Sequence, residues 1–156
     1  IYGFTMMYRE TKDERFLNAA QKAADFFINH ENLPKDKIPY WDFNADDKGY
    51  KADWDYEKRK MSYIPRDASA GSLVASALLE LSTFSGEQGK KYFNTAEEML
   101  KSLSGEEYLA KEGTNSGFIL KHSVGSYPHD SEIDVPLIYA DYYFLEALLR
   151  YQALKK

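Results

Sequence analysis

Two loops of this chain gather the residue types that recognise polar ligands. The first, residues 31–66, carries Trp41 and Asp42 and ends at Arg66. The second, residues 113–133, carries the other candidate contacts, which are His122, Ser126, Tyr127 and His129. Aromatic rings stack on the apolar faces of sugars, while arginine, histidine and hydroxyl groups hydrogen-bond to carboxylates and hydroxyls. We predict these seven residues as ligand contacts.

Each candidate also has a structural interpretation. Trp41 and Asp42 can pin the first loop to the body of the protein instead of facing a ligand. Arg66 can pair with Asp67, which is placed to cap the helix that follows, or it can hold a ligand carboxylate with its planar, bidentate donor. The polar residues of the second loop would look the same in a solvated loop without a ligand.

The composition excludes several classes of site. Twenty basic and twenty-five acidic residues give a net charge of -5, and the basic residues form no patch, so nucleic acid and anionic membranes are poor partners. No cysteine is present, which excludes thiolate chemistry. His122 and His129 lack the spacing of a known metal motif, so we expect no metal. No apolar run approaches the roughly 20 residues that a membrane span requires.

Helices that flank these loops must position them. Apolar residues recur at helical spacing in five segments, at residues 1–10, 16–28, 68–84, 90–103 and 137–149. Asp13 and Asp67 are predicted to cap the second and third helices. Asp134 is predicted to cap the last one, with Pro136 in its first turn. We therefore predict an all-α fold.

The predicted helices alternate between two kinds. Residues 1–10, 68–84 and 137–149 are apolar nearly all round, as in buried helices, whereas the two others are amphipathic. Arg15–Ala20 and Lys91–Ala96 are similar and occupy the same place in the two amphipathic helices. This pattern indicates helical hairpins that pair an inner with an outer helix around a common axis. Both long loops then emerge where inner helices begin, and helix N-termini at that end favour an anionic ligand.

Five stretches carry a resemblance to a known family. They are Tyr2-Gly3-Phe4, Pro39-Tyr40-Trp41-Asp42-Phe43, Pro65-Arg66-Asp67-Ala68-Ser69-Ala70, Leu78-Leu79-Glu80-Leu81-Ser82 and Tyr139-Ala140-Asp141-Tyr142-Tyr143-Phe144-Leu145-Glu146-Ala147-Leu148. In these stretches, and in their order, the chain resembles the unsaturated glucuronyl hydrolases, glycoside hydrolase family 88.

The resemblance implies a six-hairpin α/α toroid of alternating inner and outer helices. It also implies an enzyme that removes a 4,5-unsaturated uronic acid from the non-reducing end of oligosaccharides left by polysaccharide lyases. In that family an aspartate protonates the C4=C5 double bond, water adds at C5, and the resulting hemiketal collapses, without a metal or cofactor. The resemblance also implies a location in the bacterial cytoplasm or periplasm.

The chain departs from the family in its extent. Residues 1–156 correspond to the C-terminal part of a single toroid domain, starting within an inner helix. The family's two central aspartates would precede Ile1, so we expect no catalytic residue in this chain and no hydrolytic activity from it alone. Its unshared inner-helix faces should expose apolar surface, which predicts association with the missing N-terminal half or self-association.

Two local departures concern the loops. The segment between Phe43 and Pro65 is longer than the family's usual link, and with Trp54 and Tyr56 it is either a lid over the substrate or a solvated loop. The family's Ser-x-x-Ser-x-Lys pattern for a sulfated sugar would fall on residues 126–131, where only Ser126 matches.

Two alternatives remain for the function. One is a non-catalytic helical-repeat module that binds a glycan or a protein. The other is an unsaturated rhamnogalacturonyl hydrolase, which shares the toroid, although Tyr40-Trp41-Asp42-Phe43 argues against it.

Asp141 and Glu146 lie in the apolar last helix. We expect them to have structural partners, through an ion pair or a cap interaction with a neighbouring helix, rather than a catalytic role.

Overall fold

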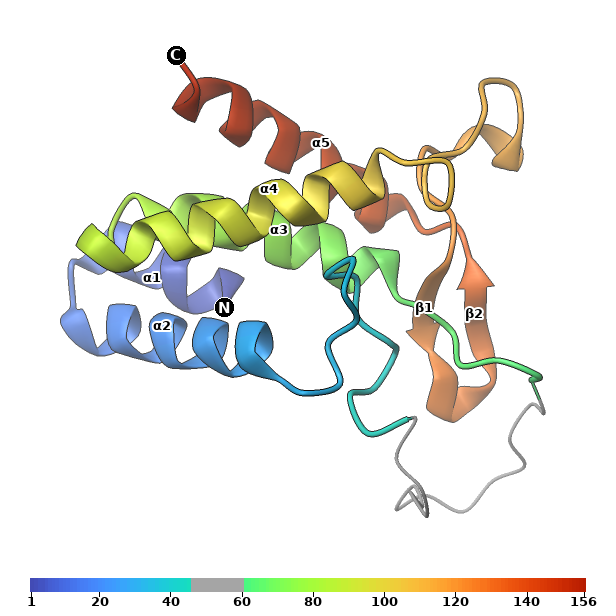
Figure 1. Cartoon of the computed structure of the whole chain (residues 1–156), viewed down its shortest axis with the longest axis horizontal. Helices are drawn as coiled ribbons and strands as arrows, with labels where there is room; N and C mark the ends of the chain where they lie inside the picture. The colour runs from blue at the N-terminus through green and yellow to red at the C-terminus, as the bar shows by residue number, and fades with distance from the viewer. Residues whose placement is uncertain (46–60) are drawn as a thin grey trace.

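The computed structural model describes residues 1–45 and 61–156, and helices dominate them (Figure 1). The helices are α1 Tyr2–Thr11, α2 Glu14–Asn29, α3 Ala68–Ser82, α4 Gly89–Leu103 and α5 Ile138–Leu154. A small antiparallel sheet of β1 Ser123–Ser126 and β2 Ser131–Val135 precedes α5. The predicted helical fold is confirmed, with this hairpin as an addition.

Helix α3 forms the centre of the structure. It packs against α4, α5 and α1, and most of its residues are buried. Its small residues, among them Gly71, Ser72 and Ala75, let neighbouring elements approach on several sides. A Cβ on Gly71 would lie only 3.0 Å from the side chain of Ile38, which belongs to the first loop. The prediction of a buried inner helix is thus confirmed for α3.

The two amphipathic helices lie on the outside, as predicted. Helix α2 buries Leu17, Ala20, Ala24 and Phe27, and α4 buries a similar stripe of Tyr92, Ala96, Met99, Leu100 and Leu103. The carboxylate of Asp13 accepts a hydrogen bond from the backbone N–H of Arg15, at 2.9 Å, so the predicted cap of α2 is confirmed. Helix α1 packs on α2, and α3 packs on α4, which gives the expected helical hairpins.

The predicted start of the last helix was wrong. Asp134 lies in β2 rather than at a helix N-cap, and α5 begins at Ile138, after Pro136. The reason is that residues 131–135 pair with residues 123–126, around a turn at Tyr127–His129. The second loop therefore contains regular structure that the expected loop of residues 113–133 did not include.

Both long loops meet at the start of α3. The backbone N–H of Ala68 donates to the carbonyl of His122 at 2.9 Å, and the N–H of Asp67 donates to the carbonyl of Pro39 at 2.8 Å. The carboxylate of Asp67 accepts a further bond from the N–H of Val124, at 3.2 Å. The loops therefore emerge at the end where α3 and α5 begin, as predicted (Figure 1). We call this end the rim.

Apolar side chains line one exposed side of α5. Ile138, Tyr142, Leu145 and Leu149 follow one another at helical spacing and are 71%, 59%, 47% and 67% exposed. On α1, Phe4, Met6 and Met7 are also exposed. The expected exposure of unshared inner-helix faces is confirmed. None of the helices described here has the length and apolarity to cross a membrane.

Candidate functional site

An aromatic pair at the rim joins the two loops. Trp41 of the first loop and Tyr127 of the hairpin stack with ring centroids 4.3 Å apart and an interplanar angle of 13°. The N–H of Trp41 donates to the carbonyl of Pro65 at 3.1 Å, which attaches its segment to the chain entering α3. Two residues predicted to bind a ligand, 86 positions apart in sequence, are thus brought together by the fold.

A cavity of about 310 Å³ lies against this pair. Its walls include the Trp41 and Tyr127 rings together with Tyr63 and Pro65. Next to Tyr127, the hydroxyl of Ser126 lies 2.8 Å from Nδ1 of His129. Aromatic walls with a polar edge suit a sugar ring, which has apolar faces and hydroxyl edges.

Asp42 shapes the first loop. Its carboxylate accepts a hydrogen bond from the N–H of Asn44 at 2.7 Å, and the N–H of Ala45 donates to its carbonyl at 3.2 Å. An aspartate that bonds the backbone two residues later forms a local turn. Both contacts lie within the first loop, so they shape a turn there and do not attach the loop to the body of the protein.

Arg66 faces a different partner from the predicted one. Its guanidinium pairs with Asp36, its Nε donates to the carbonyl of Ile38 at 3.0 Å, and it lies over the ring of Tyr40. The predicted pairing of Arg66 with Asp67 is therefore wrong. The Asp67 carboxylate instead points toward the first turn of α3.

Asp67 is a helix cap, as predicted. Its Oδ1 accepts hydrogen bonds from the N–H and the hydroxyl of Ser69, at 3.0 and 2.6 Å, as well as the bond from Val124. Burial raises the pKa of the Asp67 carboxyl, while these hydrogen bonds oppose the shift. The residue links α3 to the hairpin through its carboxylate.

His122 and Asp134 form a pair at the base of the hairpin. Nδ1 of His122 lies 2.6 Å from the carboxylate of Asp134, and the hydroxyl of Tyr63 donates to the same carboxylate. Burial raises the pKa of Asp134, but the bonds from Tyr63 and His122 hold it below its usual value. This pair was not predicted from the sequence. Asp134 was interpreted as a helix cap, and Tyr63 was not among the candidate residues.

This pair lines a second cavity, of about 270 Å³, together with Tyr63, Arg66 and Tyr108. Tyr63 also lines the cavity beside Trp41. The seven predicted contacts therefore divide into two groups. Trp41 and Tyr127 form the aromatic stack, Asp42 and Ser126 adjoin them in sequence, and His129 contacts Ser126. Arg66 and His122 line the second cavity instead.

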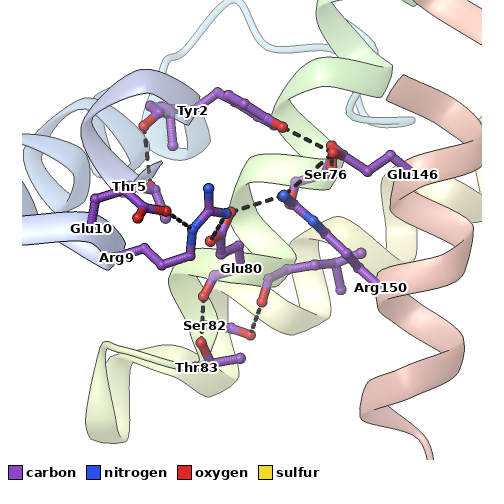
Figure 2. Close-up of polar contacts among 12 residues, drawn as sticks. Tyr2, Thr5, Arg9, Glu10, Ser76, Glu80, Ser82, Thr83, Glu146 and Arg150 are labelled. Atoms are coloured by element: carbon purple, nitrogen blue, oxygen red, sulfur yellow. Dashed lines mark hydrogen bonds and ion pairs between the residues drawn. The ribbon is translucent and has the colours of Figure 1, made fainter. Parts of the chain in front are cut away.

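A second polar cluster connects the three inner helices (Figure 2). Glu146 of α5 accepts hydrogen bonds from the hydroxyls of Tyr2 of α1, at 2.9 Å, and Ser76 of α3. Arg150 lies one turn further along α5 and is 3.5 Å from Glu146. The expected structural role of Glu146 is confirmed, but its ion-pair partner lies on its own helix and its contacts with the neighbouring helices are the two hydrogen bonds.

The same cluster continues to α1 through Glu80 of α3. This carboxylate pairs with Arg150 at 3.0 Å and with Arg9 of α1 at 2.8 Å, and its side chain is 11% exposed (Figure 2). Two arginines and two glutamates thus compensate one another between α1, α3 and α5. We call Tyr2, Arg9, Ser76, Glu80, Glu146 and Arg150 the inner-helix network.

Asp141 has backbone partners rather than an ion pair. Its two carboxylate oxygens accept hydrogen bonds from the N–H groups of Ile119 and Leu120, at 2.9 and 2.8 Å. The expectation of a structural role is confirmed, but the partner is the loop before the hairpin instead of a neighbouring helix. Both oxygens of this buried carboxylate therefore have hydrogen-bond donors.

The predicted lid, with Trp54 and Tyr56, lies outside the described residues. Within residues 1–45 and 61–156, no three histidine, aspartate or glutamate side chains gather in a way that would hold a metal ion.

No family model matches the chain, but individual proteins do. It is 46% identical over 154 residues to an unsaturated glucuronyl hydrolase of Formosa agariphila, covering 99% of this chain and 35% of that protein. It is 30% identical to an unsaturated chondroitin disaccharide hydrolase of Streptococcus pneumoniae, covering 97% of this chain and 35% of that protein. The chain thus spans about a third of the length of the curated relatives that it matches.

Comparison with solved structures leads to the same proteins. The fold matches the crystal structure of an unsaturated glucuronyl hydrolase specific for heparin with a TM-score of 0.87 and 51% identity, covering 99% of this chain and 38% of that one. It matches a mutant unsaturated glucuronyl hydrolase of Streptococcus agalactiae, complexed with dGlcA-GalNAc6S, with a TM-score of 0.78 and 29% identity, covering 96% and 36%. The fold class, part of an α/α toroid, is confirmed. Both comparisons confirm the resemblance to the unsaturated glucuronyl hydrolases over nearly all of this chain and about a third of theirs.

Proposed function

We propose that this chain is part of a glycoside hydrolase that removes 4,5-unsaturated uronic acid from the non-reducing end of lyase-generated oligosaccharides. The observation that carries the proposal is the 46% identity to an unsaturated glucuronyl hydrolase over 154 residues. The complete protein would protonate the C4=C5 bond at C4 and add water at C5. The hemiketal would then open and release the next sugar.

In this proposal the rim binds the sugar. Trp41 and Tyr127 offer ring faces, and Ser126 and His129 offer polar groups at the edge of the same cavity. The N-terminus of α3 lies at this end, and the carboxylate of Asp67 caps it. These features support a role in shaping the sugar site, with Asp42 shaping the loop that carries Trp41.

The proton donor would lie outside this chain. Among the described aspartates near the rim, Asp67 caps α3, Asp134 binds Tyr63 and His122, and Asp36 binds Arg66 and Tyr108. Each of these carboxylates is engaged by groups of this chain, which gives it a structural role, and the pKa of Asp134 is also lowered, which makes it a poorer general acid. We therefore propose that residues 1–156 form the C-terminal part of one toroid domain and contain no catalytic residue.

The exposed apolar faces of α1 and α5 would be covered by the rest of that domain. The stripe of Ile138, Tyr142, Leu145 and Leu149 has the spacing of a helix that packs against another. If this chain is produced alone, the same faces should drive self-association. Light scattering at increasing dilution tests this point, and a stable monomer would contradict it.

The activity is tested by following the ultraviolet absorbance of the unsaturated uronate. The chain alone should leave an unsaturated disaccharide unchanged, whereas the complete protein should remove the double bond. In the complete protein, Trp41→Ala should raise KM by about tenfold, the equivalent of ~1.4 kcal/mol of lost stacking, with a smaller effect on kcat.

Leu154→Ala, at a 42% exposed side chain at the end of α5 opposite the rim, is the control and should leave KM unchanged. Turnover by the chain alone would contradict the assignment of the proton donor. A complete protein that binds the disaccharide without consuming it would instead support the glycan-binding module.

A further inference from the structure

We propose that Asp134 is a positioning residue, which holds Tyr63 and His122 together and thereby fixes the stack of Trp41 on Tyr127. Its relevance to sugar binding rests on the proposed function, whereas its effect on the stack does not. Asp134 does not line the cavity beside Trp41, so its effect would be indirect.

The carboxylate of Asp134 connects three segments. It belongs to β2, it binds His122 just before β1, and it accepts the hydroxyl of Tyr63 from the segment that leads into α3. Tyr63 is otherwise 53% exposed. The hydrogen bond to Asp134 therefore decides where this ring lies.

Tyr63 lies close to both halves of the stack. It precedes Pro65, whose carbonyl binds the N–H of Trp41, and it lines the cavity that Trp41 and Tyr127 share. The hairpin that carries Tyr127 is held at its base by the contact between His122 and Asp134. One carboxylate thus connects the wall that carries Trp41 to the hairpin that carries Tyr127.

The backbone supports a dedicated role for this pair. His122 and Asp134 both adopt left-handed conformations, with φ of 61° and 56°, next to the irregular pairing between Ser123 and Val124. Such conformations are unfavourable for residues other than glycine and persist where surrounding contacts determine them. Histidine and aspartate tolerate them better than most residues.

Three variants separate the backbone from the carboxylate. Asp134→Gly accepts the left-handed backbone but removes both side-chain contacts. Asp134→Asn keeps an oxygen that accepts a hydrogen bond, and Tyr63→Phe removes only the tyrosine hydroxyl. Glu132→Gly is the matched control, because Glu132 lies in the same strand at a φ of 54° with an exposed side chain.

The stack is observed directly in a Trp54→Phe background, where Trp41 is the single tryptophan of the chain. Tyr127→Ala defines the emission and near-ultraviolet circular dichroism of an unstacked Trp41. We expect Asp134→Gly to give the same spectrum as Tyr127→Ala, and Tyr63→Phe to give a spectrum between that one and the parent spectrum. Asp134→Asn and Glu132→Gly should retain the parent spectrum. Far-ultraviolet circular dichroism identifies the variants that remain folded.

If folded Asp134→Gly keeps the parent spectrum, the proposal is overturned. If Glu132→Gly changes the spectrum as much as Asp134→Gly, the effect comes from the backbone and the proposal is equally overturned. Should Asp134→Gly unfold, Tyr63→Phe decides in its place, and an unchanged spectrum there overturns the proposal. Disaccharide affinity of the complete protein is measured separately. An altered stack with unaltered affinity contradicts the sugar-binding role of the rim and leaves the positioning role standing.

Discussion

The rim and the inner-helix network both gather polar side chains from distant parts of the chain, but they do so differently. The network lies on three helices, and its charges are compensated by one another, as between Glu80 and its two arginines. The rim is built from loops and a hairpin, and its central contact is the stack of Trp41 on Tyr127 beside an open cavity. The comparison indicates that the network maintains helix packing, whereas the rim leaves ring faces and polar edges for a ligand.

The largest expected effect on the free energy of unfolding comes from a change in the inner-helix network. Arg150→Ala should lower the free energy of unfolding by about 3 kcal/mol, because it leaves Glu146 and the largely buried Glu80 with one cation fewer. Tyr127→Ala at the rim should cost less than about 1 kcal/mol, since it removes one partly exposed ring from an aromatic pair. Urea unfolding followed by circular dichroism measures both.

The control for charge is Arg15→Ala. Arg15 pairs with Asp13 but its side chain is 88% exposed, so the loss should be within about 0.5 kcal/mol. If Arg150→Ala behaved like Arg15→Ala, the network would contribute no more than a surface ion pair and the contrast with the rim would disappear.

A smaller effect tests the helix packing on which the network depends. Gly89 begins α4, and a Cβ there would lie 2.2 Å from the carbonyl oxygen of Ser82 in α3. Gly89→Ala should therefore destabilise the fold by about 2 kcal/mol, because backbone must move.

Gly3→Ala in α1 is its matched control. A Cβ at Gly3 meets nothing within 4 Å, so the substitution should stabilise the protein by about 0.5 kcal/mol through higher helix propensity. Thermal unfolding of the two variants gives opposite shifts if α3 and α4 approach as closely as described.

The smallest effect concerns two rim carboxylates with opposite pKa shifts. Burial raises the pKa of Asp67 in the folded state, so the folded state binds this proton more readily and Asp67 adds stability as the pH falls. The pKa of Asp134 is lowered, so its contribution is lost as the pH falls through its folded pKa. Asp67→Asn should make the loss of stability on acidification steeper, and Asp134→Asn should make it shallower.

Urea unfolding at several values between pH 5 and 3 measures these slopes. Parallel curves for both variants and the parent would show that neither carboxylate titrates differently in the folded protein. Such a result would remove the electrostatic distinction between the two rim carboxylates.

Local sequence determined the helices and two of their caps. The spacing of Leu17, Ala20, Ala24 and Phe27 predicted the buried side of α2, and Asp13 and Asp67 were identified as caps from their place before apolar runs. These features depend on residues within a few positions of one another. The convergence of both loops at one end also followed from the order of inner and outer helices.

Long-range partners decided what local patterns could not. Asp134 preceded Pro136 and an apolar helix, which is the pattern of a cap, but pairing with residues 123–126 placed it in a strand beside His122 and Tyr63. Arg66 lies beside Asp67 in sequence, yet its guanidinium reaches Asp36, 30 residues away. A side chain of this length chooses among neighbours that only the folded chain brings close.

The sequence by itself therefore determined the helical architecture, the family resemblance and the residue types at the rim, since periodicity and motifs are properties of contiguous chain. The tertiary structure decided the rest: that Trp41 stacks on Tyr127, that Arg66 and His122 line a second cavity with Tyr63, and that two arginines and two glutamates connect α1, α3 and α5. Those contacts join positions far apart in the chain, and their geometry depends on how helices and loops pack together.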